Sequence, residues 1–221
     1  MSIYVDVYTD NWTIKMRFNK PLNHILDSQP KVICLRLLCN HPTEINGRQL
    51  SKIVGLSPTT VHKAMKELAN EQIINLKNYG NSHVYELNRH HKVVREILAS
   101  LFNKERALLK DFIKDITNRI KKSNVRNAIV SIALFGSVHE GSEGPKSDID
   151  LCIIVKELKD KKSVEDLIFA INSQTLPETG MRIEPYIKTI KEFKRDKNLG
   201  VIKSIQKSNQ IIWGENLEKI Q

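Results

Sequence analysis

The sequence predicts an α+β protein of two domains, a helical N-terminal domain with a small hairpin and a C-terminal domain on a mixed sheet, joined by a long helix. Its 221 residues are enough for two small hydrophobic cores. From about His91 to Lys122, apolar residues recur at helical spacing for longer than in a usual globular helix. A continuous apolar run over Ala128–Phe135 is typical of a buried strand. We therefore expect four segments: a hairpin over 1–20, a helical domain over 21–90, a helical linker over 91–122 and a sheet domain over 123–221.

The composition is that of a soluble globular protein, with 40% hydrophobic and 27% charged residues. No apolar run has the length of a membrane helix, and the N-terminus lacks the pattern of a signal peptide, so we expect a cytoplasmic protein without membrane contact. The three cysteines, Cys34, Cys39 and Cys152, lie in apolar runs and form no Cys-x-x-Cys pair. This pattern predicts buried thiols and neither a disulfide framework nor a zinc site.

The positive charge is concentrated in the first part of the chain. The net charge is +10, and residues 1–130 hold 21 Lys and Arg against 11 Asp and Glu, whereas residues 131–221 hold 14 of each kind. A basic half next to a neutral half predicts that a polyanion contact lies in the basic half. The alternative is a solvated basic face without a partner.

The N-terminal segments show two patterns of secondary structure. Residues 3–18 alternate between apolar and polar side chains around Thr9-Asp10-Asn11, which predicts a hairpin that packs on the next domain or on a second copy of the chain. Val32–Leu38 is a compact apolar run that predicts a buried helix.

The region after Gly47 shows a specific order of elements. A short amphipathic helix over Gln49–Val54 ends at Gly55, and Ser57-Pro58 supplies an N-cap and a first-turn proline for a second helix that ends near Asn70. The runs at 73–77 and 84–87 then predict a hairpin. Over residues 22–90, this order resembles the winged helix-turn-helix fold of MarR-like and ArsR-like regulators.

The resemblance implies that the second helix enters a DNA major groove with its N-terminal half. In this sequence, Lys63 and Lys66 are then the candidates for phosphate contacts, and Thr59, Thr60 and His62 are the candidates for base contacts. Winged helices also act as protein-contact or dimerisation modules, so DNA and protein both remain possible partners. For the apolar face of the long helix, pairing in a homodimer and packing within the chain are equal alternatives.

A glycine-rich turn separates two apolar strands in the C-terminal part. Gly136-Ser137 ends the first strand, and Asp148-Ile149-Asp150 begins the second. Because side chains alternate along a strand, Asp148 and Asp150 share one face while Ile149 points into the core. Two neighbouring carboxylates repel each other unless a cation lies between them, and carboxylate oxygens suit Mg²⁺. The backbone at Gly136 is able to approach phosphate oxygens closely because this residue has no Cβ.

Gly136-Ser137, ten intervening residues and Asp148-Ile149-Asp150 together resemble the signature of polymerase-beta-like nucleotidyltransferases, in particular the minimal ones of prokaryotes. The resemblance implies that Asp148 and Asp150 hold two Mg²⁺ ions, with Mn²⁺ as an alternative, across the triphosphate of an NTP, for which ATP is the expected substrate. It also implies that Gly136 and Ser137 anchor phosphates. The further nucleotide-binding candidates in the turn are Lys146 and Ser147.

The family also uses a third carboxylate on a later strand, as the base or metal ligand that activates the attacking hydroxyl. Met181–Ile187, which follows a helix-like stretch and a loop with Pro177 and Gly180, predicts that strand, and Glu184 is its acidic residue. Pro185 lacks a ladder donor and therefore predicts an edge strand or a strand end. The alternative is that Glu184 only pairs with Arg182 on the same face. Near the C-terminus, Trp213 is predicted to belong to the core.

The acceptor of the transferred group is open. Minimal nucleotidyltransferases as a group act as antitoxins that transfer AMP to a HEPN-type toxin, so the resemblance implies a protein tyrosine as one acceptor. A nucleic-acid 3′-hydroxyl is a second candidate acceptor, and a small molecule such as an aminoglycoside is a third. A different function class is a DNA-binding transcriptional regulator whose second domain senses nucleotide with weak or no catalysis.

Overall fold

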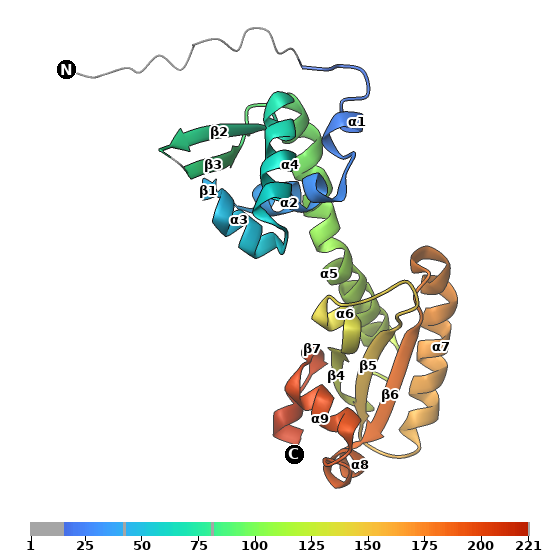
Figure 1. Ribbon diagram of the computed structural model, residues 1–221. Coiled ribbons are helices and arrows are strands. Elements are labelled where there is room, and N and C mark those ends of the chain that lie inside the picture. Colours follow the sequence, from blue (N-terminus) through green and yellow to red (C-terminus); the bar gives the residue numbers. More distant parts are fainter. Residues whose placement is uncertain (1–15, 42, 81, 221) are drawn as a thin grey trace, which may run out of the picture. The chain divides into compact units, whose positions relative to one another are not determined.

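The computed structural model describes residues 16–41, 43–80 and 82–220, and the chain divides into two compact units, Met1–Leu108 and Leu109–Gln221 (Figure 1). The hairpin predicted over residues 1–20 lies outside the described residues except for its last five positions, of which 16–18 form no strand. Both units mix helix and sheet, which confirms the predicted α+β class.

The first unit consists of short helices and a small antiparallel sheet. Its elements are α1 (Leu22–Ile25), α2 (Gln29–Asn40), β1 (Ile45–Asn46), α3 (Gly47–Val54), α4 (Pro58–Asn70), β2 (Ile74–Tyr79), β3 (Ser82–Leu87), a π-helical turn (Val94–Leu98) and the start of α5 (Ala99–Lys122). The strands lie in the order β1-β3-β2. This is the order of elements that the winged helix-turn-helix resemblance implies.

Local sequence signals explain where α3 and α4 begin and end. The Asn46 side chain accepts a hydrogen bond from the Gln49 amide at 2.9 Å, and Gly55 ends α3 with a φ of 67° that suits glycine. The Ser57 hydroxyl accepts from the Thr60 amide at 3.1 Å and caps α4, as predicted. These two caps fix the lengths of both helices and the turn between them.

The core of the first unit joins α2, α4, the sheet and the start of α5. Its largest fully buried side chains are Ile25, Leu35, Leu38, Leu50, Met65, Leu68, Ile73, Tyr85 and Leu98. Lys31 is also buried, and its ammonium group lies 2.9 Å from Asp27 and 2.8 Å from Glu67. Because Glu67 belongs to α4, this ion pair connects α2 to the helix that carries the predicted DNA contacts.

The second unit is built on a four-stranded mixed sheet. Its elements after α5 are β4 (Ile129–Phe135), α6 (Gly136–Glu140), β5 (Ile149–Val155), α7 (Asp160–Thr179), β6 (Ile183–Thr189), α8 (Ile190–Arg195), α9 (Gly200–Lys207), β7 (Gln210–Gly214) and a 3₁₀ turn (Leu217–Ile220). The strand order is β6-β5-β4-β7, in which β5 and β6 are parallel and the other neighbours are antiparallel. The predicted mixed sheet is therefore present, and β6 is an edge strand, as Pro185 predicts.

Side-chain alternation buries both faces of this sheet. Along β5, Ile149, Leu151 and Ile153 pack with α5 and α7 on one face, while Cys152 and Ile154 pack with α8, α9 and the C-terminal turn on the other (Figure 1). The residue two positions before Cys152 lies on that second face as well. The side chain of Asp150 therefore lies on the face that α8 and α9 cover. It is near the start of β5 and is half-buried.

The helix predicted over 91–122 contributes to the cores of both units. Leu98 and Phe102 are buried in the core of the first unit, and Ile116 and Ile120 are buried in the core of the second. The boundary between the units falls inside α5. These four side chains therefore pack within the chain, which is one of the two alternatives that the sequence left open for the apolar face of this helix.

One loop prediction was wrong. Pro177 does not lie in a loop, because α7 continues to Thr179 and ends at Gly180, which has a φ of 69°. Proline removes one backbone donor, but hydroxyl groups in the same turns donate to main-chain carbonyls, Thr175 to Ile171 and Thr179 to Thr175. The last turns of α7 therefore stay helical.

Cys34 and Cys152 are buried, as predicted, whereas Cys39 is only half-buried. All three cysteines are free thiols, and burial raises the pKa of Cys152 to about 12, so this thiol stays protonated. Trp213 is half-buried and packs against the core, as predicted. Among the described residues, no helix is both long and apolar enough to cross a membrane.

Candidate active site

The side chain of Asp150 lies against the glycine that follows β4. In the sheet, Asp150 is paired with Phe135 on β4 and with Glu184 on β6. Gly136 has a φ of 72°, and a Cβ at this position would overlap the Asp150 carboxylate and lie 3.1 Å from its Cγ. The backbone conformation therefore favours glycine, and any side chain at this position would also force the Asp150 carboxylate to move. The geometry brings Gly136 and Asp150 together as the sequence predicts.

The site concentrates negative charge. Burial raises the pKa of Asp150 above its usual range, and the neighbouring charges of Asp148 and Glu184 raise it further. Within the described residues, neither aspartate forms an ion pair with Lys or Arg. Two carboxylates without a cationic partner create a potential that attracts cations.

The raised pKa of Asp150 predicts how stability depends on pH. Because the folded chain binds this proton more tightly than the unfolded chain, stability falls as the pH rises from 3.8 through the raised pKa. At neutral pH, Asp150→Asn is therefore expected to raise the unfolding temperature of the second unit by about 2 °C. Calorimetry at pH 7 and at lower pH should show that the gain shrinks on acidification. The control is Glu178→Gln, which removes an exposed carboxylate, and a destabilising effect of Asp150→Asn at pH 7 would contradict the prediction.

Glu184 shows features of both interpretations that the sequence allows. It is the register partner of Asp150 and contributes to the raised pKa of that residue. Its carboxylate also lies 3.7 Å from the Arg182 guanidinium, and its side chain is 56% exposed. In the part of the chain that the structure describes, no group of three or more His, Cys, Asp or Glu side chains is positioned to hold a metal ion. The described residues therefore do not bring Asp148, Asp150 and Glu184 together as a three-carboxylate metal site, although Glu184 lies beside Asp150 in the sheet register.

The glycine-rich turn uses its polar groups in two ways. The Ser147 hydroxyl accepts a hydrogen bond from the Gly144 amide at 2.9 Å, and the Ser147 amide donates to the Gly144 carbonyl at 3.0 Å. Ser147 thus closes the turn that leads into Asp148. Ser137, on α6, makes no side-chain hydrogen bond within the described residues, so its hydroxyl is available to a ligand. Lys146 is exposed in the turn.

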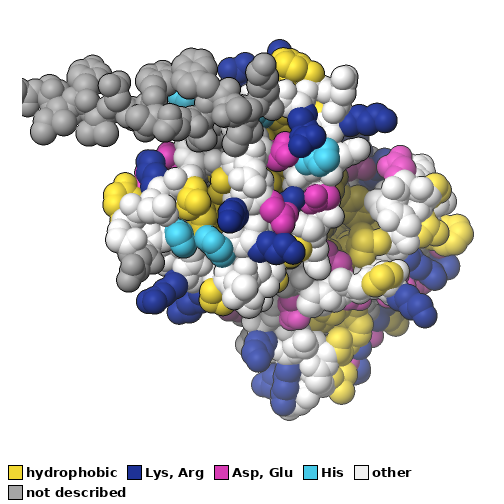
Figure 2. Space-filling model, turned by 45° about the horizontal axis from the view of Figure 1, so that its top comes forward, with side chains coloured by type: hydrophobic (Ala, Val, Ile, Leu, Met, Phe, Trp, Pro, Cys, Tyr) yellow, Lys and Arg dark blue, Asp and Glu magenta, His cyan; other side chains and the backbone are white. Residues whose placement is uncertain are grey.

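The predicted DNA-contact residues on α4 divide into two groups. Thr59, Lys63 and Lys66 are exposed and follow one another at helical spacing on one face. The Thr60 hydroxyl lies 2.8 Å from Ser57 Oγ, where it belongs to the helix cap. Figure 2 shows one face of the molecule on which basic side chains are scattered among acidic and apolar ones without a single continuous patch.

His62 faces the hairpin of the first unit. Its Nδ1 lies 3.1 Å from the Tyr85 hydroxyl, and its ring stacks on the His83 ring with centroids 4.7 Å apart. These contacts join α4 to β3. The sequence shows no sign of them because the three residues are separated by up to 23 positions.

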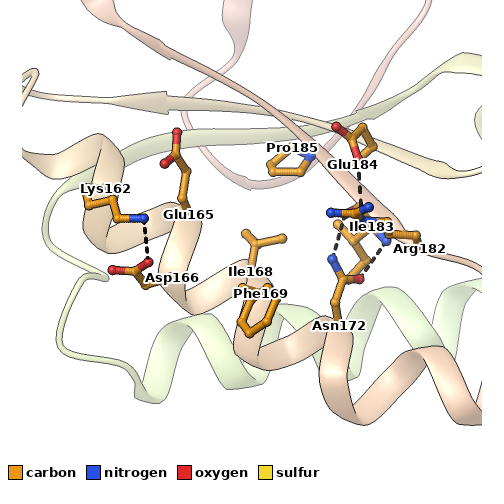
Figure 3. Close-up of a pocket in the computed structure, with 10 residues that line it drawn as sticks. All are labelled: Lys162, Glu165, Asp166, Ile168, Phe169, Asn172, Arg182, Ile183, Glu184 and Pro185. Carbon is orange, nitrogen blue, oxygen red and sulfur yellow. Dashed lines mark hydrogen bonds and ion pairs between the residues drawn. The ribbon is translucent and has the colours of Figure 1, made fainter.

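A pocket between α7 and the edge strand β6 was not predicted (Figure 3). Its volume is about 360 Å³. Its wall includes Asn172, whose side-chain amide donates to the Ile183 carbonyl at 2.9 Å and accepts from the Ile183 amide at 2.7 Å. Asn172 follows Val164 and Ile168 at four-residue spacing, and a polar residue on such a buried stripe is the sequence signal that would have identified it.

Two family models match separate parts of the chain. The model of the nucleotidyltransferase domain matches residues 113–213, and the model of the winged helix-turn-helix DNA-binding domain matches residues 35–75. A search of the curated proteins found no match.

Three solved structures are similar to parts of the chain. NolR from Sinorhizobium fredii is 18% identical, with a TM-score of 0.30 and coverage of 35% of this chain and 73% of its own. A mutant of the toxin-antitoxin MntA-HpeT is 11% identical, with a TM-score of 0.34 and coverage of 48% and 76%. A toxin-antitoxin with AMP-PNP is 17% identical, with a TM-score of 0.30 and coverage of 46% and 75%.

Each family match lies within one of the two units that the structure defines. Residues 35–75 contain α3 and the capped helix α4, and residues 113–213 contain β4, β5, β6 and all but the last residue of β7, with the Asp150 and Gly136 contact. Both observations agree with the resemblances found in the sequence. The chain carries a winged helix-turn-helix domain followed by a nucleotidyltransferase domain.

Proposed function

We propose that the chain is a metal-dependent nucleotidyltransferase that moves a nucleoside monophosphate, with AMP as the expected group, from an NTP to a hydroxyl acceptor. The observation that carries the proposal is the packing of the Asp150 carboxylate on Gly136, next to Asp148 and Glu184. A glycine that allows a phosphate to approach and a carboxylate pair that attracts cations are both needed to bind a metal-bound triphosphate.

The donor atoms of this site fit a hard divalent cation. Asp148 and Asp150 offer carboxylate oxygens, and burial, followed by the charges of Asp148 and Glu184, raises the pKa of Asp150. We infer that these two residues hold Mg²⁺, or Mn²⁺ in its place, in a two-ion arrangement with the substrate. The ions would neutralise charge on the phosphate oxygens.

The residues around the aspartates then have separate roles. The Gly136 backbone and the Ser137 hydroxyl donate hydrogen bonds to phosphate oxygens, and Lys146 adds positive charge at the turn. The acceptor oxygen forms a bond to the α phosphorus while the bond from that phosphorus to pyrophosphate breaks. Glu184 accepts the proton of the acceptor hydroxyl. Positioning and charge neutralisation supply most of the rate in this mechanism.

Labelled ATP tests the reaction. With Mg²⁺ and a competent acceptor, label in the α phosphate should move to the acceptor and label in the γ phosphate should leave with pyrophosphate. Asp148→Asn removes one metal ligand and is expected to slow transfer about 100-fold. Glu178→Gln, an exposed site on α7, is the matched control and should keep full activity. Transfer of γ label, or full activity of Asp148→Asn, would reject the proposal.

The acceptor is to be found by the same assay. A HEPN-type toxin, an oligonucleotide with a free 3′-hydroxyl and an aminoglycoside represent the three acceptor classes. Label that becomes bound to protein, extends the oligonucleotide or modifies the small molecule identifies the class.

We propose a second function for the first domain, sequence-dependent DNA binding that makes the chain a regulator with a nucleotide-binding domain. The observation that favours it is the exposed row of Thr59, Lys63 and Lys66 on the capped helix α4. In this arrangement the lysines contact phosphates and Thr59 contacts base edges. Glu67, on the neighbouring face, is held by Lys31, which fixes the helix to the core.

Removing both lysines is expected to weaken DNA binding uniformly across sequences. For Lys63→Ala with Lys66→Ala, the slope of log K against log salt should fall by about 2, because each lysine neutralises one phosphate. Gel shifts with the chain's own promoter region at several salt concentrations measure this slope. Lys104→Ala, an exposed lysine on α5, is the control. An unchanged slope would show that α4 does not face the DNA backbone.

A further inference from the structure

We propose that the pocket between α7 and β6 is a docking site for a segment of a separate protein that inserts an apolar side chain next to a basic one. Three features of the pocket carry this inference: an exposed aromatic ring on its helix side, a closed strand edge and an excess carboxylate. The binding does not require nucleotidyl transfer.

The pocket presents one strongly exposed apolar side chain. The Phe169 ring on its helix side is 73% exposed, whereas Ile168 and Ile183 are buried beneath the pocket and Pro185 lies on the strand side. Burial of this exposed aromatic ring against an apolar side chain of a partner would remove apolar surface from water and is therefore favourable. A volume of about 360 Å³ fits one or two side chains.

The edge of β6 is closed to main-chain pairing at this point. Asn172 occupies both the amide and the carbonyl of Ile183, and Pro185 has no N–H to donate. Ile183 and Pro185 are alternate residues of β6, and their backbone groups point to the same side of the strand, away from β5. A partner therefore cannot add a strand here and has to bind through side chains.

The charges at the rim define the flanking residue of the partner. Lys162 lies 3.1 Å from Asp166, and Arg182 lies 3.7 Å from Glu184. Within the described residues, the remaining carboxylate of the pocket, Glu165, has no ion pair. In Figure 3 the Glu165 side chain extends from α7 toward the strand side of the pocket. A Lys or Arg beside the apolar anchor complements this charge.

The pocket and the candidate active site lie on opposite faces of the sheet. The pocket is on the face that α7 covers, whereas the side chain of Asp150 starts from the face that α8 and α9 cover. Glu184 lines the edge of the pocket and is the register partner of Asp150. The proposed dock is therefore separate from the site of the proposed reaction.

A random dodecapeptide display library selected against the full chain tests the proposal. The peptides retained should combine an apolar residue with an adjacent Lys or Arg. In fluorescence polarisation with a labelled selected peptide, Phe169→Glu and Glu165→Lys should each weaken binding at least ~10-fold. The matched controls are Leu158→Glu, which is 69% exposed outside the pocket, and Glu178→Lys, and both should bind as the unmodified chain does.

The outcomes separate docking from catalysis. Asp148→Asn should keep peptide binding even when transfer is lost, so failure of the proposed reaction leaves the dock testable. If no peptide is retained, or if Phe169→Glu and Leu158→Glu bind alike with unchanged thermal unfolding, the proposal is wrong. If sedimentation shows a dimer that Phe169→Glu dissociates, the occupant is a second copy of the chain and the proposal is also wrong.

Discussion

Gly136→Ala is expected to lower the rate of nucleotidyl transfer at least ~1000-fold, more than the loss of a single metal ligand. The added methyl group would overlap the Asp150 carboxylate, and the φ of 72° at this position is unfavourable for alanine. Either Asp150 or the turn has to move. Both movements separate the carboxylates from the backbone that we propose to hold the phosphates, so binding and chemistry fail together.

The chain offers a control that separates the two causes. Gly141 ends α6 with a φ of 68°, and a Cβ there would meet nothing within 4 Å. Gly141→Ala therefore has the same backbone cost of about 1 kcal/mol without the overlap. Steady-state transfer with α-labelled ATP should leave this variant within about threefold of the unmodified chain. Equal losses in both variants would mean that turn conformation, and not the contact with Asp150, limits the reaction.

Features that depend on neighbours in the sequence could be predicted. Ser57 and Pro58 define the start of α4, and Gly55 defines the end of α3, because capping requires residues only a few positions apart. The same holds for the buried strands on both sides of the glycine-rich turn. The spacing of Asp148 and Asp150 predicts that both lie on one side of a strand, and in the structure Asp150 belongs to β5 while Asp148 comes directly before it and is exposed.

Features that depend on distant parts of the chain could not be predicted. The position of Glu184 beside Asp150 was expected only from the family resemblance, because it follows from parallel pairing of β6 with β5, which the sequence of either strand does not specify. The contact of His62 with Tyr85 and the two hydrogen bonds from Asn172 to Ile183 are of the same kind. Hydrogen-bond partners of this kind are selected by tertiary packing, so a polar residue on a buried stripe indicates that a partner exists without naming it.

Glycine also has a structural role at the other edge of the sheet. Gly214, the last residue of β7, has a φ of 84°, and a Cβ there would overlap the Val130 carbonyl and lie 2.9 Å from Ser131 Cα. Just beyond it, the Glu215 amide donates to the Val130 carbonyl at 3.0 Å, and the Ser131 hydroxyl donates to the Glu215 carbonyl at 2.6 Å. These bonds close β7 onto β4, the strand that leads into Gly136.

Gly214→Ala is expected to destabilise the nucleotidyltransferase domain by about 3 kcal/mol. The overlapping atoms belong to the backbone of β4, which is buried between its neighbours and has no rotamer to change, so β7 must shift and lose its pairing at this end. Gly180→Ala is the matched control: its φ is 69° and a Cβ there meets nothing within 4 Å, so only the backbone cost of about 1 kcal/mol remains.

Urea unfolding followed by Trp213 fluorescence measures both variants, in a Trp12→Phe background that removes the other tryptophan. The midpoint should fall much further for Gly214→Ala than for Gly180→Ala. Because β4 carries the turn at Gly136, transfer activity of Gly214→Ala should also be lost at urea concentrations where the control is still active. If the two glycine variants unfold at the same urea concentration, the contact between β7 and β4 does not limit the stability of this domain.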